Sequence, residues 1–116
     1  MPRNVPCFFS ESSVYRADTC RPLVQAAESG ELVFQALARG HYPGKRLPRR
    51  ALPGLKSAGY WDARVDQAWG LDWHRNEGIE IMFLETGRNA FAVDDRSMTL
   101  DSDSLVVTRP WQRHRL

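Results

Sequence analysis

The alternation of apolar and polar residues becomes regular from about Ala58 onward. Short apolar runs recur there and are separated by turn residues such as Gly87 and the pair Asp94-Asp95. Runs of this length and spacing are typical of strands in an antiparallel barrel or sandwich. We predict strands over Tyr60–Val65, Gln67–Trp73, Ile79–Glu85, Ala90–Val93, Met98–Asp101 and Leu105–Thr108.

The N-terminal part of the chain has a different texture. Residues 1–17 show no clear period and are predicted to form an arm, with Phe8 and Phe9 as its anchors, ahead of a domain over residues 18–116. The arm is expected to depend on that domain for its order, because its two prolines, aromatic residues and serines are scattered without a pattern.

One short amphipathic helix is predicted between the arm and the strands. Asp18 or Thr19 can cap its first amides, and its apolar pattern stops at Ser29 or Gly30. Residues 31–39 either extend this helix or form a strand, and their alternation after the glycine favours the strand. The proline-rich residues 41–53 are predicted to be a loop of fixed shape.

The composition fits one small domain. The chain has 116 residues, of which 42% are hydrophobic and 26% charged, enough for a single core. Its 16 basic and 14 acidic residues give a net charge of +2, too balanced for the positive field that nucleic-acid-binding domains usually carry. Prolines interrupt the basic cluster of Lys45, Arg46, Arg49 and Arg50, so we expect a solvated loop rather than a phosphate contact.

Other classes of protein are disfavoured by what the sequence lacks. Cys7 and Cys20 form no CxxC pair and accompany no secretion signal, so both thiols are expected to be reduced. No apolar run approaches the roughly 18 residues of a membrane span, and we expect a cytoplasmic protein without membrane contact. Nucleophile elbows and phosphate-binding glycine loops are missing, which argues against hydrolases and kinases.

Glu80 is an unusual residue within its predicted strand. It lies on the face opposite Ile79, Ile81 and Phe83, among residues that are themselves apolar. A carboxylate with apolar residues on both faces of its strand either points into a pocket or needs a buried partner.

Two stretches around Glu80 and the C-terminus resemble the two cupin motifs. In the first, His74, Glu80 and Gly87 stand where cupins have a histidine, a glutamate and a glycine, and Asn76 stands where they have a second histidine. In the second, an apolar strand precedes a proline and His114, although the turn glycine is missing and the last gap is one residue short.

The cupin resemblance implies a candidate metal set of His74, Glu80 and His114. Two histidines and a carboxylate suffice for a divalent transition metal, as in non-haem iron oxygenases, so a stand-alone oxygenase or isomerase is the alternative function. The degraded motif and the basic neighbours Arg109, Arg113 and Arg115 disfavour a cation and favour an organic ligand. We therefore expect no cofactor and no catalysis.

A wider set of phrases resembles the N-terminal effector-sensing domains of AraC-type transcription regulators. The phrases are Tyr42-Pro43-Gly44, Gly59-Tyr60-Trp61-Asp62-Ala63, Trp69-Gly70-Leu71, His74-Arg75-Asn76-Glu77-Gly78-Ile79-Glu80 and Arg109-Pro110-Trp111-Gln112-Arg113-His114. The resemblance implies a mostly β fold, a small antiparallel cupin or jelly-roll barrel with one short N-terminal helix. It also implies a homodimer that binds a small metabolite such as a sugar and controls helix-turn-helix units. Since the sequence ends at Leu116, we expect an excised domain or truncated product whose DNA-binding domain is absent.

The candidate ligand residues follow from what a sugar pocket needs, which is aromatic faces and planar polar groups. Among the four tryptophans we choose Trp73 and Trp111, because they stand beside the motif histidines. The polar candidates are His74, Asn76, Glu80, Arg109 and His114. Ordinary packing of these residues is the competing interpretation, as is a structural dimerisation unit with a filled pocket.

Overall fold

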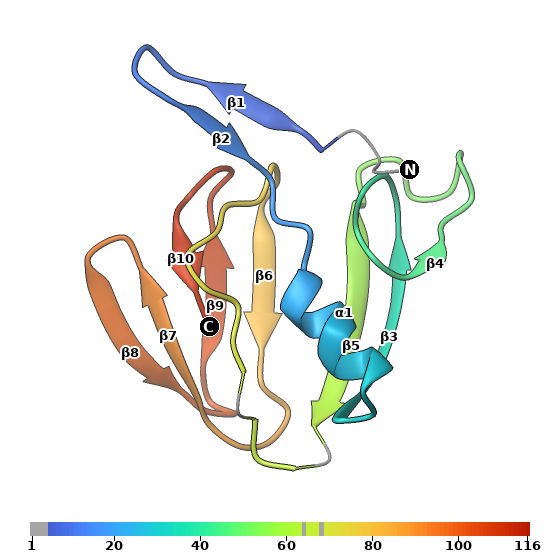
Figure 1. Ribbon diagram of the computed structural model, residues 1–116, viewed down its shortest axis with the longest axis vertical. Coiled ribbons are helices and arrows are strands. Elements are labelled where there is room, and N and C mark those ends of the chain that lie inside the picture. The colour runs from blue at the N-terminus through green and yellow to red at the C-terminus, as the bar shows by residue number, and fades with distance from the viewer. Residues whose placement is uncertain (1–4, 64, 68) are drawn as a thin grey trace. The chain divides into compact units, whose positions relative to one another are not determined.

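The computed structural model describes residues 5–63, 65–67 and 69–116. These residues form a mostly β structure with one short helix (Figure 1). The chain divides into two compact units, one of Val5 with residues 19–70 and the other of residues 6–18 and 71–116. The elements are β1 Cys7–Phe9, β2 Val14–Arg16, α1 Arg21–Glu28, β3 Leu32–Ala38, β4 Lys45–Arg46, β5 Ser57–Ala63, β6 Glu80–Phe83, β7 Asn89–Val93, β8 Arg96–Leu100, β9 Leu105–Thr108 and β10 His114–Arg115.

The first unit is built on a three-stranded sheet with β3 at its centre. β3 pairs with β5 in antiparallel register from Leu32↔Ala63 to Ala38↔Ser57, and with β4 in parallel. The strand prediction for residues 31–39 is thus confirmed. Gly59 lies opposite Ala36, and a Cβ at Gly59 would come within 2.5 Å of the Ala36 Cβ, so this pairing needs a glycine.

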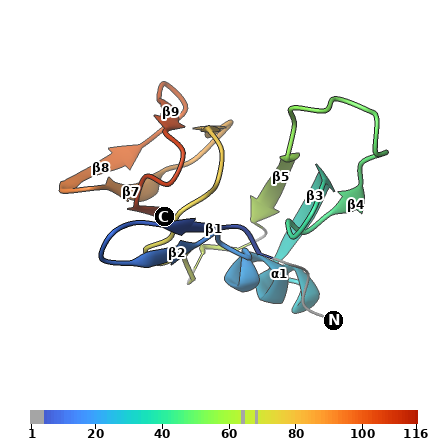
Figure 2. The ribbon, with the colours of Figure 1, turned by 90° about the horizontal axis from the view of Figure 1, so that it is seen from above.

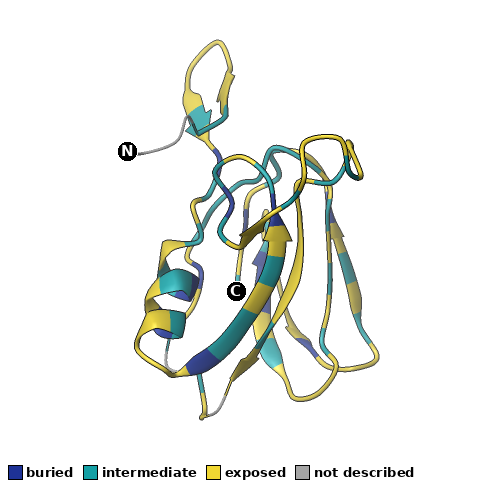
Figure 3. Cartoon of the chain, turned by 90° about the vertical axis from the view of Figure 1, so that its right-hand side faces the viewer, coloured by how far each residue is buried: buried dark blue, intermediate teal, exposed yellow. Residues whose placement is uncertain are grey.

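The helix α1 lies beside β3 (Figure 2). Its N-cap is Cys20, in a left-handed conformation with φ 56° and without a side-chain cap, so the prediction that Asp18 or Thr19 caps the helix is wrong. Its C-cap is Ser29, and Gly30 follows with φ 83°, where a glycine is favoured. The core residues of this unit are Leu23, Ala26, Leu32, Ala38 and Tyr42 (dark blue in Figure 3). No helix in the described ranges has the length and apolar character that crossing a membrane requires.

Two arginines fasten the loop between β3 and β5. The Arg39 guanidinium and Nε donate to the backbone carbonyls of Arg49 at 2.8 Å, Leu55 at 3.1 Å and Ala51. Arg46 likewise donates to carbonyls of the turn that precedes it. The sequence predicts a fixed shape from the prolines alone, whereas the structure also ties the loop to these two cationic donors.

The second unit contains three small antiparallel sheets. β6 pairs with β9, β7 lies between β10 and β8, and β1 pairs with β2. Its buried apolar residues are Ala17, Leu71, Phe91, Ala92 and Leu100. The β1–β2 hairpin is a finding that the sequence does not predict, because residues 1–17 show no strand-like alternation.

Most of the predicted strands of the second half are present. The exception is Gln67–Trp73, where Gln67 and residues 69–73 form no strand and residue 68 lies outside the described residues. The mostly antiparallel β architecture with one helix is confirmed. The described strands form four separate sheets, and the closed cupin barrel stays a prediction.

Replacing Arg39 should destabilise the first unit. We expect Arg39→Ala to lower the free energy of unfolding by about 1–3 kcal/mol, because three carbonyls lose a charged donor at once. Urea unfolding measures the change. The control is Arg50→Ala, an exposed arginine of the same loop, and equal losses in both variants would contradict the fastening role of Arg39.

Candidate functional site

Strand β6 places Glu80 on the interior face of its ribbon. Glu80 and Met82 are partly buried, while Ile81 and Phe83 on the opposite face are exposed. Strand β9, which pairs with β6, also has its buried residue on this face, since Thr108 is the register partner of Glu80 and is buried. The alternation predicted from the sequence is therefore confirmed, with Glu80 facing inward.

Backbone pairing brings the two motif histidines together. The amide of His74 donates to the carbonyl of His114 at 2.9 Å, and the amide of His114 donates back at 3.0 Å. Their rings lie 4.2 Å apart between centroids. His114 itself is held by the pairing of β10 with β7 and is only 1% exposed.

Four of the predicted ligand residues meet in what we call the polar cluster, made of His74, Asn76, Glu80 and His114. His114 Nε2 lies 3.0 Å from Glu80 Oε2, and Asn76 Nδ2 donates to the same oxygen at 2.6 Å. One ligand atom from each of His74, Glu80 and His114 lies within 4.8 Å of the others. Residues separated by 34 positions in sequence thus form one site.

Carbonyl contacts fix the tautomer of both histidines. His114 Nδ1 lies 2.8 Å from the carbonyl of Gln112, and His74 Nδ1 lies 2.7 Å from that of Asp72. A carbonyl only accepts, so each Nδ1 carries the hydrogen. The Nε2 of His114 then faces the Glu80 carboxylate as a bare lone pair unless a proton or another cation lies between them. The site is built to share a positive charge.

This contact moves the pKa of both groups. Burial alone would raise the pKa of Glu80, but the hydrogen bond and charge of His114, the amide of Asn76 and the charge of His74 hold it below its ordinary value of 4.5. Burial alone would lower the pKa of His114, but Glu80, the Gln112 carbonyl and Asp18 raise it above its ordinary value of 6.5. The two groups therefore favour an ion pair.

Buried polar atoms around the cluster lack partners within the described residues. They are Asn76 Oδ1, Thr108 Oγ1 and Asp18 Oδ2. Asn76 bonds Glu80, Thr108 is the register partner of Glu80, and the charge of Asp18 acts on His114. A fourth such atom, His41 Nε2, lies in the other unit. Buried polar atoms are nearly always hydrogen-bonded, so a water molecule or a ligand group is the expected partner of each of them.

Three predicted ligand residues lie outside the polar cluster. The side chain of Arg109 is 79% exposed and lies 4.0 Å from Asp94. The ring of Trp73 is covered by the guanidinium groups of Arg113 and Arg115, at 3.8 and 5.0 Å. These two arginines are among those that the sequence suggested would repel a cation, and both lie over the ring of the residue that precedes His74. The ring of the third residue, Trp111, packs against Phe8 at 5.7 Å.

The hairpin of the arm connects to the cluster through Trp111. The ring of Phe8 contacts those of Trp111 and Tyr15, and the Trp111 amide donates to the carbonyl of Asn76 at 2.7 Å. Arg75 lies 4.0 Å above the Tyr15 ring. Phe8 is 43% exposed and makes these ring contacts, and Phe9 is 74% exposed, so the anchoring of the arm by the two phenylalanines stays a prediction.

The sequence analysis missed Thr108 and Asp18 as site residues. Alternation along β9 offered a signal for Thr108, because its side chain shares the interior face with Val106. Asp18 offered no such signal, and its short side chain suggested a helix cap instead.

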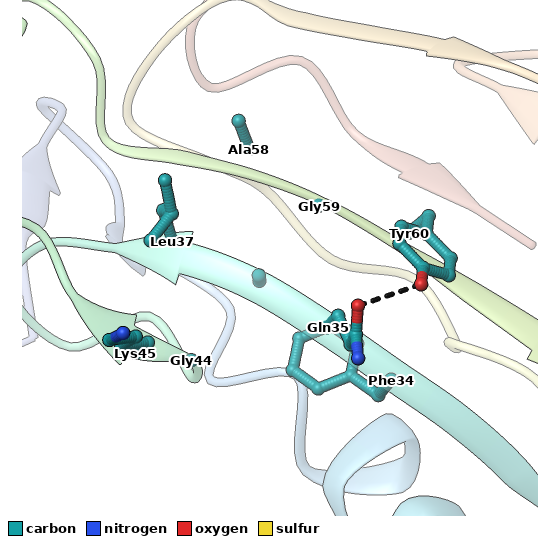
Figure 4. A pocket seen from close by; sticks show the side chains of 9 residues that line it. Phe34, Gln35, Leu37, Gly44, Lys45, Ala58, Gly59 and Tyr60 are labelled. Carbon is teal, nitrogen blue, oxygen red and sulfur yellow. Dashed lines mark hydrogen bonds between the residues drawn. The ribbon is translucent and has the colours of Figure 1, made fainter.

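A separate cavity of about 520 Å³ lies on the sheet of the first unit (Figure 4). Its lining includes Phe34, Leu37 and Lys45, and the Tyr60 hydroxyl donates to Gln35 Oε1 at 2.7 Å. None of the predicted ligand residues lines it.

Comparisons with models of protein families, with curated proteins and with solved structures find no match. The functional interpretation therefore depends on the geometry of the polar cluster and on the motif resemblance.

The ion pair of the cluster gives a pH-dependent stability. The contribution of His114, whose folded pKa is raised, is complete below pH 6.5 and lost as the pH rises through that folded pKa. The contribution of Glu80, whose folded pKa is lowered, is complete above pH 4.5 and lost as the pH falls through that folded pKa. We expect the stability difference between the wild type and His114→Gln to be greatest between pH 4.5 and pH 6.5, the ordinary pKa values of the two groups.

Urea unfolding at several pH values measures this difference. The matched control is His41→Gln in the other unit, which should show no such maximum. A difference for His114→Gln that stays constant from about pH 5 to 9 would contradict the ion pair.

Proposed function

We propose that this chain is the effector-sensing and dimerisation domain of an AraC-type transcription regulator, and that its polar cluster binds a small hydroxylated metabolite such as a sugar. The observation that carries the proposal is the set of unpartnered buried atoms beside the cluster, Asn76 Oδ1, Thr108 Oγ1 and Asp18 Oδ2. The phrases shared with AraC-type sensing domains support it independently.

The chemistry of these atoms selects a polyol over an apolar ligand. Asn76 Oδ1 and Asp18 Oδ2 need donors, and Thr108 Oγ1 both donates and accepts. A hydroxyl offers one donor and two acceptor lone pairs, so neighbouring hydroxyls of one ligand match this mixture. Each buried group left unpaired costs about 1–3 kcal/mol, which a fitting ligand recovers.

The arm supplies a route by which occupancy would become a signal. The Asn76 carbonyl accepts from the Trp111 amide, and the Trp111 ring packs on Phe8 of the hairpin. A ligand that shifts Asn76 thus acts on the arm through two contacts, with Trp111 as the residue between them. A two-state arm of this kind changes its equilibrium when a ligand favours one state.

A thermal-shift screen with monosaccharides and sugar acids tests the proposal. We expect one ligand class to raise the Tm of the wild type in a concentration-dependent way, because ligand binding to the folded state stabilises it. Asn76→Ala and Thr108→Val should each weaken binding about 10-fold or more, for the loss of one hydrogen bond.

The control is Thr99→Val, which removes an exposed hydroxyl from β8 of the same unit and should leave binding unchanged. Stabilisation that survives both Asn76→Ala and Thr108→Val would contradict the assigned site. The absence of stabilisation by every hydroxylated compound would contradict the function.

A metal-dependent cupin enzyme, an oxygenase or isomerase, is the second candidate function. It is favoured by the spacing of His74, Glu80 and His114 and by the Nδ1 contacts, which leave the Nε2 lone pair of each neutral imidazole to bind a metal in place of a proton. The 3.0 Å separation of His114 Nε2 and Glu80 Oε2 also suits two neighbouring ligands at about 2.1 Å from one ion. A divalent metal there would supply Lewis acidity and open positions for substrate.

Elemental analysis of freshly purified protein separates the two candidates. The enzyme candidate requires near-stoichiometric iron, manganese, nickel or zinc that is lost in His74→Ala and kept in His41→Ala, a histidine outside the second unit. Metal-free protein that a sugar stabilises supports the sensor instead.

A further inference from the structure

One face of the β6–β9 ribbon is apolar and exposed. Its members, which we call the Ile81 face, are 57–69% exposed and comprise Ile79, Ile81, Phe83, Leu105 and Val107. The register sets Ile81 opposite Val107 and Phe83 opposite Leu105, so these side chains form one continuous surface. The polar cluster lies on the other side of the same ribbon.

The area of this surface suits the centre of a protein interface. At about 25 cal/mol per Å², the 1.5–3 kcal/mol gained by burying a large apolar side chain corresponds to roughly 60–120 Å². Five such side chains at about two-thirds exposure then offer on the order of 300 Å² per copy. A standard interface buries about 800 Å² per partner, with an apolar centre and a polar rim.

The charges at the two ends of the ribbon indicate what binds to the Ile81 face. Arg109 follows β9 directly at one end and is exposed. The other end of the ribbon is acidic. It carries three exposed acidic residues, Glu85 after β6 and Asp101 and Asp103 before β9, and one basic residue, Arg88, in the adjacent turn. The contact of Arg109 with Asp94 is long and exposed, so it holds the guanidinium only weakly.

A second copy matches this arrangement. A two-fold axis that lies in the interface and runs across the strands would set each Ile81 face on its equivalent. It would also place Arg109 of each copy over the acidic end of its partner. We propose that the Ile81 face is the surface through which two copies of this chain associate, antiparallel and face to face. The proposal deepens the proposed function by naming its dimer contact, but the effector plays no part in it.

Sedimentation equilibrium of the full chain tests the proposal. Protein concentrations of roughly 1–100 µM cover the dissociation constants of moderate interfaces. We expect a dimer whose affinity falls at least 10-fold in Val107→Lys and in Phe83→Lys, since a lysine on this surface must be desolvated. Val14→Lys is the matched control, because Val14 is 56% exposed on another strand while Val107 is 57% exposed. It should dimerise like the wild type.

A charge reversal at Arg109 leaves the apolar residues of the Ile81 face unchanged. It therefore tests the proposed contact even where the lysine variants do not fold. Arg109→Glu should also weaken the dimer, and Glu85→Arg in the same chain should restore it. Near-ultraviolet circular dichroism checks that each variant is folded.

Three results would overturn the proposed surface: a monomeric wild type at every concentration, folded lysine variants that dimerise normally, or Arg109→Glu with unchanged affinity. The thermal-shift assay keeps the two proposals separate. If the protein is monomeric and a sugar stabilises it, the proposed dimer surface is wrong and effector binding is supported. If it is a dimer that no ligand stabilises, the dimer surface is supported and effector binding is wrong.

Discussion

The contact between His114 Nε2 and Glu80 Oε2 is the constraint on which the second unit depends. His114 is almost completely buried, and its Nδ1 hydrogen is committed to the carbonyl of Gln112. The remaining nitrogen must therefore share a proton or another cation with the carboxylate. This requirement ties β6 to β10, and the pairing of His74 with His114 adds the segment that carries Asn76. A single shared charge thus links three stretches of chain that are distant in sequence.

The same strand serves two surfaces because strand side chains alternate. Glu80 and Met82 face the polar cluster, while Ile81 and Phe83 lie on the exposed face. A register slip of one residue would exchange the two sets, placing a carboxylate outside and leaving His114 unpaired. The pairing of Glu80 with His114 therefore fixes which apolar residues remain exposed and available to a second copy.

The sequence predicts the parts of this structure that depend on local pattern. Alternation identifies β3, β6 and β9, and the spacing of His74, Glu80 and His114 is enough to predict that they meet. The arm hairpin and the Cys20 cap depend on contacts that local pattern does not contain, and no periodicity marks them. Aromatic residues are the hardest to assign, since Trp73 follows the pattern of a ligand platform and yet its face is covered by arginines close in sequence to His114.

Asn76 is the residue that distinguishes a sensor from a metal enzyme in physical terms. At the position where cupins have a second histidine, an imidazole would offer the site a lone pair. The amide instead donates a hydrogen at 2.6 Å to Glu80 Oε2, the oxygen that also contacts His114 Nε2, and so competes with a cation for that oxygen. Its own oxygen is left buried without a partner. An asparagine at this position of the resembled motif thus supplies no imidazole ligand, engages the Glu80 carboxylate, and offers an acceptor that suits a hydroxyl group, as the proposed organic effector would require.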